Sequence, residues 1–292
     1  MKIDYAAKLP RSVPSKARVY ELAPPRTTSK QLLSMADALG QRGLSAETIS
    51  SRTSLGAMVG RWSLAMHRAS GALRLMEVDR YGSDGLSADM PFELSDRKAT
   101  GVAQKFASAL RLVPAGEGKV LAVTHLRQGG AEVKGERSGA RTPERLLDAG
   151  VVFGRSIDEL PVIGPGGMVM VNVAGDGAVV GARRIWRGLG RGVATVKLQP
   201  ADWALRTFEA VVRERFMGDI RVVKAQLGYL ELGELDRQSL IEPVYAFAFV
   251  AQHGEVASKH VHVMHAGDKA HGKLMGARRF VATKQARRKP AD

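Results

Sequence analysis

The chain has 292 residues, enough for two or three ordinary domains, and its 45% hydrophobic and 25% charged residues are typical of a globular protein. Because the chain has no cysteine, disulfide bonds, a thiolate nucleophile and cysteine-ligated metal centres are excluded. No run of 18 apolar residues is present, so the sequence predicts no membrane-spanning helix. The formal net charge of +15 favours acidic partners such as nucleic acid, anionic lipid or an acidic protein surface.

The first part of the chain predicts one helix and three strands. Residues 1–17 indicate an extended lead-in, and residues 18–22 indicate a short strand that two prolines end. Residues 29–40 predict a helix, because Ser29 is a suitable N-cap and the segment closes on a glycine. A Ser/Thr-rich linker follows, and then two strand-like runs at 62–66 and 73–78.

The middle of the chain repeats this order. Ser95 is a suitable cap for a helix that reaches Leu112 with its apolar residues on one side. The Asp-Gly turn at 175–177 joins two alternating runs, which is a strong hairpin signal. The expected strands of this region are residues 120–123, 151–153, 166–173 and 178–186.

A third helix is expected from Pro200 to Phe216, since proline suits a first helical turn. Strands are expected at 221–230, 244–250 and 259–264. A helix followed by a meander thus occurs three times, at spacings of about 65 and 105 residues. We therefore expect an α+β fold made of repeated units, each with one helix packed on an antiparallel sheet. The expected parts are a lead-in (1–17), a faint first unit (18–92), a second unit (93–192), a third unit (193–267) and a basic tail (268–292).

The segment from Leu160 to Val173 reads Leu-Pro-Val-Ile-Gly-Pro-Gly-Gly-Met-Val-Met-Val-Asn-Val, and the 175–177 turn and the strand Val180–Trp186 follow it. This order resembles PepSY-like repeats and the related YycH/YycI-type regulatory ectodomains. In those families a short Pro-Val-x-Gly lead precedes a strand, an Asp-Gly turn and a returning strand. The third unit resembles them through its helix, Leu227-Gly-Tyr229 and the strand entry at 240–247.

The resemblance covers residues 95–266 and, more faintly, residues 18–80. It implies cystatin-like α+β modules that bind, regulate or inhibit, often outside the membrane and next to peptidases or sensor kinases. It transfers no catalytic residue to this chain. The chain departs from the families in lacking their usual signal or membrane anchor and in carrying a basic tail.

The histidine run His260-Val-His262 is the sharpest local pattern. In a strand, residues two apart project to the same face, as a His-x-His metal site requires. Metal binding by His260 and His262 is therefore one hypothesis, and it would make a divalent metal the only cofactor. The alternative is that both histidines are exposed edge-strand residues that alternate with core Val261 and Val263.

Other patterns favour structural roles. Gly164–Gly167 precedes a strand pattern, so a turn is expected there and not a phosphate-binding loop, which needs a helix N-terminus. Residues 188–192 are expected to be a flexible connection. Two carboxylate groups are available for acid–base catalysis, Asp158-Glu159 and the set of Glu231, Glu234 and Asp236, although acidic loop residues are usually solvated.

Two basic segments are candidates for partner binding. Arg183, Arg184 and Arg187 surround Trp186, which would serve as a surface aromatic anchor. The second segment is the basic tail, where Lys269 to Asp292 holds eight basic residues and one acidic residue, a contribution of 8 − 1 = +7. This tail would be a solvated terminus or a non-specific contact with acidic surfaces. Its candidate contact residues are Arg278, Arg279, Arg287 and Arg288.

These patterns favour a non-enzymatic binding or regulatory module that holds a peptide or protein partner on an antiparallel sheet. Nucleic-acid association through the basic tail is one alternative. An enzyme with a pocket on the sheet face is another. Edge strands also allow homo-oligomers. As the sequence stands we expect a cytoplasmic protein, or an extracytoplasmic one if a leader has been removed.

Overall fold

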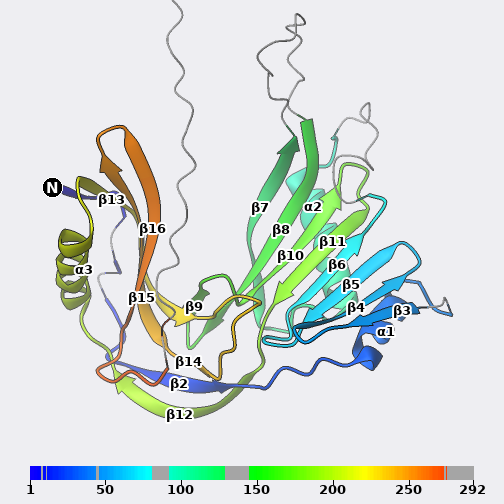
Figure 1. Cartoon of the computed structure of the whole chain (residues 1–292), viewed down its shortest axis with the longest axis horizontal. Helices are drawn as coiled ribbons and strands as arrows, with labels where there is room; N and C mark the ends of the chain where they lie inside the picture. The colour runs from blue at the N-terminus through cyan, green and yellow to red at the C-terminus, as the bar shows by residue number, and fades with distance from the viewer. Residues whose placement is uncertain are drawn as a thin grey trace, which may run out of the picture.

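The computed structural model describes residues 1–7, 9–10, 12–43, 46–80, 92–128, 145–272 and 274. Two bodies stand side by side on a shared base and diverge away from it (Figure 1). Within the described ranges, no helix has both the length and the apolar character needed to cross a membrane.

The large body contains two helices and eight strands. They are α1 (Ser29–Ala38), β3 (Ala46–Ser50), β4 (Ser54–Val59), β5 (Trp62–His67), β6 (Leu73–Glu77), α2 (Asp96–Ala109), β7 (Gly118–Gln128), β8 (Arg145–Ile157), β10 (Met168–Ala174) and β11 (Val179–Ile185).

The small body consists of β1 (Ile3–Tyr5), α3 (Ala201–Arg215), β13 (Asp219–Leu230), β15 (Pro243–His253) and β16 (Val256–His265). The base is a three-stranded sheet of β2 (Lys16–Leu22), β12 (Leu189–Lys197) and β14 (Leu240–Ile241). The short strand β9 (Leu160–Ile163) pairs with β8 of the large body and β13 of the small body, and so joins the two.

All strands that the structure describes outside the base belong to one mixed sheet of 13 strands. Its main path runs β16-β15-β13-β9-β8-β10-β11-β6-β5-β4-β3, with β1 added on β13 and β7 added on β8. The pairs β1–β13 and β9–β13 are parallel, and the other pairs of this sheet are antiparallel.

The predicted fold of repeated helix-on-sheet units is wrong. The described chain is dominated by strands, and its first and second predicted units form a single sheet because β6 pairs with β11 over a long sequence separation. Both α1 and α2 contribute to the same hydrophobic core. The prediction used the order of helices and strands along the chain. The fold depends instead on which strands pair with each other, and this order does not specify the pairing.

Several local predictions are confirmed. Ser95 caps α2 by accepting a backbone N–H hydrogen bond, and the 175–177 turn joins β10 to β11. Gly40 follows α1 with φ of +78°, the left-handed conformation that favours glycine after a helix. The cap of α1 is Thr28, one residue before the expected Ser29.

Two segments that were predicted as connections form strands. The Ser/Thr-rich linker contains β3 and β4, and β4 alternates buried Leu55, Ala57 and Val59 with partly exposed residues. The glycine-rich segment 188–192 contains the first half of β12, and the register shifts there. Small side chains made the alternation of both segments hard to recognise.

The helices of each body cover one face of its sheet. In the large body, α1 contacts β4 and β5, while α2 contacts β7, β8, β10 and β11. In the small body, Phe208 of α3 stacks on Phe247 of β15, with 4.4 Å between ring centroids. Figure 1 places α3 on the outer side of the small body, away from the large body. None of the helices in the described residues covers the opposite sheet faces.

Candidate functional site

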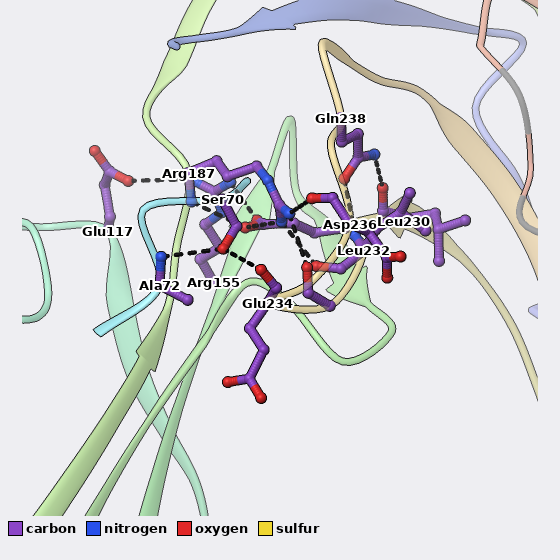
Figure 2. Close-up of polar contacts among 12 residues, drawn as sticks. Ser70, Ala72, Glu117, Arg155, Arg187, Leu230, Leu232, Glu234, Asp236 and Gln238 are labelled. Atoms are coloured by element: carbon purple, nitrogen blue, oxygen red, sulfur yellow. Dashed lines mark hydrogen bonds and ion pairs between the residues drawn. The ribbon is translucent and has the colours of Figure 1, made fainter. Parts of the chain in front are cut away.

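A fully buried carboxylate lies where the two bodies meet. Glu231 follows β13 of the small body and has no solvent-exposed surface. Its Oε2 accepts a hydrogen bond from Nη2 of Arg155 at 2.6 Å, and its Oε1 accepts one from the backbone N–H of Arg187 at 2.9 Å. Both arginines belong to the large body and are about 4% exposed or less. We call these three residues the ion cluster, and Figure 2 labels its two arginines, Arg155 and Arg187.

Arg187 also holds the segment that follows Glu231. Its guanidinium donates to the carbonyl oxygens of Leu232 at 2.7 Å, Gly233 at 2.9 Å and Asp236 at 2.7 Å. Burial lowers the pKa of Arg187, and the charge of Glu231 acts in the opposite direction. A charge-assisted contact of this kind is about twice as strong as a neutral hydrogen bond, so the loop is fixed to the large body at several points.

The glycine-rich segment 164–167 closes around the same carboxylate. The N–H of Gly166 donates to the carbonyl of Glu231 at 3.0 Å. A Cβ on Gly166 would lie 2.5 Å from the carbonyl oxygen of Leu232 and 2.6 Å from Cγ of Glu231. These glycines therefore allow two backbones to approach closely, in agreement with the expected turn, and a strand follows them.

An aromatic ring covers the outer side of the ion cluster. Arg155 lies over the Trp186 ring, 5.1 Å from the centroid, which is a cation–π contact. The indole Nε1 of Trp186 donates to Oε2 of Glu117 at 3.3 Å. Glu117 is half exposed and also lies 3.8 Å from Arg155. The cluster is thus shielded from water by packing and by a second, more exposed carboxylate.

The four residues predicted as a basic partner-binding group have different surroundings. Trp186 and Arg187 are buried in the junction, so a partner could reach them only if the junction opened. Arg184 donates from Nε to the carbonyl of Leu112 at 2.8 Å, and burial lowers its pKa. Arg183 alone is substantially exposed, and it pairs with Glu234 at 3.2 Å. The tail residues Arg278, Arg279, Arg287 and Arg288 lie outside the described residues.

His260 and His262 of β16 lie on the side of the strand that faces the core of the small body. His260 stacks on Phe249 and meets Phe216 edge-on, with ring centroids 5.3 Å and 4.6 Å away. His262 lies 6.1 Å from Phe208, and Val261 is 45% exposed on the opposite face. The assignment of the two faces of this strand was therefore reversed. In the described part of the chain, no group of three or more metal-ligating side chains lies together, and metal binding by the pair stays a prediction.

The carboxylates considered for acid–base chemistry have structural contacts. Asp158 and Glu159 have φ of +47° and +66° and form the tight turn between β8 and β9. Asp158 accepts hydrogen bonds from the hydroxyls of Tyr20 at 2.6 Å and Tyr229 at 3.4 Å. Burial, followed by the neighbouring Asp158, raises the pKa of both tyrosines.

The uncovered face of the large body carries apolar side chains together with polar ones, among them Arg74, Asn172 and Arg183. Residues of this face alternate with the core residues in each strand, as the pairing of Met170 with Val152 and Arg183 shows. Asp148 and Asn172 form a buried polar pair on it, with a hydrogen bond of 2.9 Å. We call this surface the open face. Its apolar side chains include Met58, Ala65, Met76, Leu121, Val152, Met168 and Met170.

Neighbouring side chains lie over the glycines of β8 and flatten the open face. A Cβ on Gly154 would lie 2.3 Å from Cδ1 of Leu121, and one on Gly150 would lie 2.8 Å from Oγ1 of Thr124 and 3.4 Å from Sδ of Met170. One cavity of about 200 Å³ lies at the end of the face nearest the junction, lined in part by Arg74, Arg183 and Glu234.

The loop after β13 contacts the inner faces of both bodies. Leu232 joins an apolar cluster on the uncovered face of the small body, together with Leu230, Val244 and Val263. Two residues later, Glu234 pairs with Arg183 of the open face, and its carbonyl accepts a hydrogen bond from Ser70 at 2.6 Å. The two uncovered faces therefore lie on the inner side of the molecule, on either side of this loop.

No protein family model and no curated protein matches the chain. Among solved structures, the chain is similar to a crystal structure at 1.45 Å resolution described as an uncharacterized protein from Eubacterium rectale ATCC 33656. The TM-score is 0.59 at 11% sequence identity, and the match covers 93% of this chain and 91% of that one. At this identity the similarity shows a shared fold alone. The resemblance to PepSY-like and YycH/YycI-type modules stays a prediction.

Replacement of Glu231 by glutamine is expected to destabilise the protein by about 3–5 kcal/mol, because two buried guanidinium groups lose their counter-charge. Urea unfolding followed by circular dichroism measures the change. Glu117→Gln is the matched control, since Glu117 is half exposed, and it should cost no more than about 1 kcal/mol. Equal effects of the two substitutions would contradict the assigned role of the ion cluster.

The environment of His262 predicts a pH effect on stability. Burial, followed by the charge of Arg215, lowers the pKa of His262 below its usual 6.5. Because the unfolded chain then binds the proton more readily, the contribution to stability is complete above pH 6.5 and declines as the pH falls below that value. Between pH 7 and about pH 5, His262→Phe should lose less stability than the unaltered chain.

The control for this pH effect is His253→Phe, at an exposed residue at the end of β15. Thermal unfolding at each pH should show the same decline for this control as for the unaltered chain. If His262→Phe also follows the decline of the unaltered chain, the histidine does not have the buried environment described.

Proposed function

We propose that the protein is a non-enzymatic binding module that holds a peptide or protein partner on the open face. The observation that carries the proposal is the open face itself. In the described part of the chain, helices cover one side of the large sheet, and apolar residues such as Met170 and Leu121 lie on the other side.

The shape of the open face favours a macromolecular partner over a small molecule. Small ligands usually occupy concave pockets of about 300–1,000 Å³. The cavity on this face is about 200 Å³, and its lining includes the charged residues Arg74, Arg183 and Glu234. Four partly exposed methionines, Met58, Met76, Met168 and Met170, give the flat part of the surface a flexible character that suits varied partners.

Charge supports a partner with acidic residues. Leu274, the last described residue, packs beside the apolar cluster on the inner face of the small body. Residues 275–292, which follow Leu274 in the sequence, contain six basic residues and one acidic residue. An acidic partner would gain both association rate and specificity from this charge.

The enzyme alternative has less support from the described residues. Glu231, Glu234 and Asp158 are engaged with Arg155, Arg183 and Tyr20. The nucleic-acid alternative depends on tail residues that lie outside the described part, so it becomes an outcome of the test.

Binding to the open face can be measured by NMR on protein labelled in its methionine methyl groups. A short peptide of alternating glutamate and valine, added to about 1 mM, should shift the signals of Met58, Met76, Met168 and Met170. Met217 is 79% exposed at the end of α3 and should not shift. Met170→Glu should abolish the shifts, and Met217→Glu should leave them unchanged.

Two results would overturn the proposal. In the first, the glutamate–valine peptide shifts none of the four open-face signals, or a lysine–valine peptide shifts them equally. In the second, duplex DNA shifts these signals where the peptide does not, which would favour the nucleic-acid alternative. The DNA signal should then weaken steeply with salt.

A further inference from the structure

Strand β7 forms an edge of the large sheet and lies next to a groove. β7 is 11 residues long, and among the described strands it pairs with β8 alone. In the described part of the chain, no loop forms a backbone hydrogen bond with its outer edge. Leu121 and Leu126 of this strand are 56% and 47% exposed. A long strand edge without a partner is a template for pairing with another chain.

The groove lies between β7 and the C-terminal half of α2 and has a volume of about 800 Å³. Its floor is apolar, with Val113, Val120 and the buried ring of Phe153. Gln104, Ser108 and Arg111 line the helix side at spacings of four and three residues, which places them along one side of α2. A strand added to β7 would direct every second side chain into this groove.

Two cations at the groove favour an acidic occupant. Arg111 and Lys119 line it, and in the described chain neither has an ion pair with a carboxylate. The β7 sequence itself contains Lys119 and Arg127 and no acidic residue. Pairing of two copies through β7 would bring these cationic strands together, and like charges on paired strands are destabilising. A segment with acidic residues is therefore a better occupant than a second copy of this chain.

Arg111 has a conformation that favours glycine. Its φ is +50°, and the N–H of Leu112 donates to the carbonyl of Ala107 at 2.8 Å, the pattern of a helix that ends through a left-handed residue. A side chain at this position is strained, whereas glycine is not. An arginine here lowers stability and places a cation at the groove, which is the trade-off expected of a binding residue.

We propose that an extended, acidic peptide segment of a protein partner adds to the free edge of β7, with alternate side chains in the groove and a carboxylate beside Arg111. Backbone hydrogen bonds to β7 would provide affinity, and the groove would select the side chains. This inference rests on the proposed binding function and adds a second contact region to it, at the border of the open face.

The test measures binding of the alternating glutamate–valine peptide to the full chain by isothermal titration and by backbone amide NMR. The amide signals of residues 118–126 should shift. Arg111→Gly should weaken binding about tenfold while raising the midpoint of urea unfolding. Arg97→Ala removes one charge from the exposed start of α2 and should change neither quantity substantially.

A peptide that is N-methylated at alternate residues separates strand addition from binding to the open face. It keeps the charges and side chains but loses the donors of one edge, so its binding to β7 should be lost. If the methylated peptide binds β7 equally well, or if Arg111→Gly binds like the unaltered chain, the inference is overturned.

The outcome for β7 is distinguishable from the outcome for the open face. Shifts of the methionine signals that survive N-methylation, without shifts in β7, would support the open face and overturn the inference. Shifts confined to β7 would support the inference and contradict binding to the open face. A dimer of the chain through β7, seen by sedimentation in the absence of peptide, would overturn the choice of an acidic segment as the occupant.

Discussion

The buried carboxylate of Glu231 is the constraint on which the rest of the structure depends. A charge without solvent contact must be neutralised by nearby partners, and both partners of Glu231, Arg155 and Arg187, come from the other body. The buried charges at the junction are therefore neutralised only when β8, β11 and the segment after β13 come together. Apolar packing alone would hold the bodies with less directional preference, whereas charged hydrogen bonds require a defined geometry.

The position of the ion cluster explains the arrangement of the inner surfaces. It lies near the base, where β9 pairs with both bodies and the glycines at 164–167 allow close backbone contact. Further from the base, helices cover the outer side of the small body and one side of the large sheet (Figure 1). The apolar inner faces therefore stay apart and do not collapse onto each other. Their exposure is a cost in stability that a binding role would account for.

Local structure was predictable because it depends on neighbours in the sequence. The cap at Ser95, the glycine after α1 and the Asp-Gly hairpin at 175–177 each follow from residues within one turn. The ion cluster was not predictable, since Arg155 and Arg187 lie 76 and 44 residues before Glu231. From the sequence, Glu231 is a candidate acid–base carboxylate in a loop, and Arg187 is a candidate partner-binding residue beside Trp186. The glycine segment beside Glu231 was the available signal in the sequence. Glycines that allow two backbones to approach closely indicate that a second segment of the chain packs against them.

The faces of β16 illustrate a second limit. The alternation of His260, Val261 and His262 correctly indicated a strand, but hydrophobicity assigned the valines to the core. Both sides of this strand are partly apolar, because one side packs on Phe249 and the other belongs to an uncovered inner face. A pattern of polar and apolar residues identifies the core side only when the opposite side faces water. The open face of the large body could not be recognised from the sequence pattern for the same reason.

We infer that the ion cluster sets the separation of the two bodies. The chain has no cysteine, so cysteines placed at Leu121 and Val261, which are exposed on the two inner faces, can be spin-labelled uniquely. Pulsed electron resonance should then give one narrow distance distribution for the unaltered junction and for Glu117→Gln. With Glu231→Gln, in protein that circular dichroism shows to be folded, the distribution should broaden. An unchanged narrow distribution with Glu231→Gln would contradict the account.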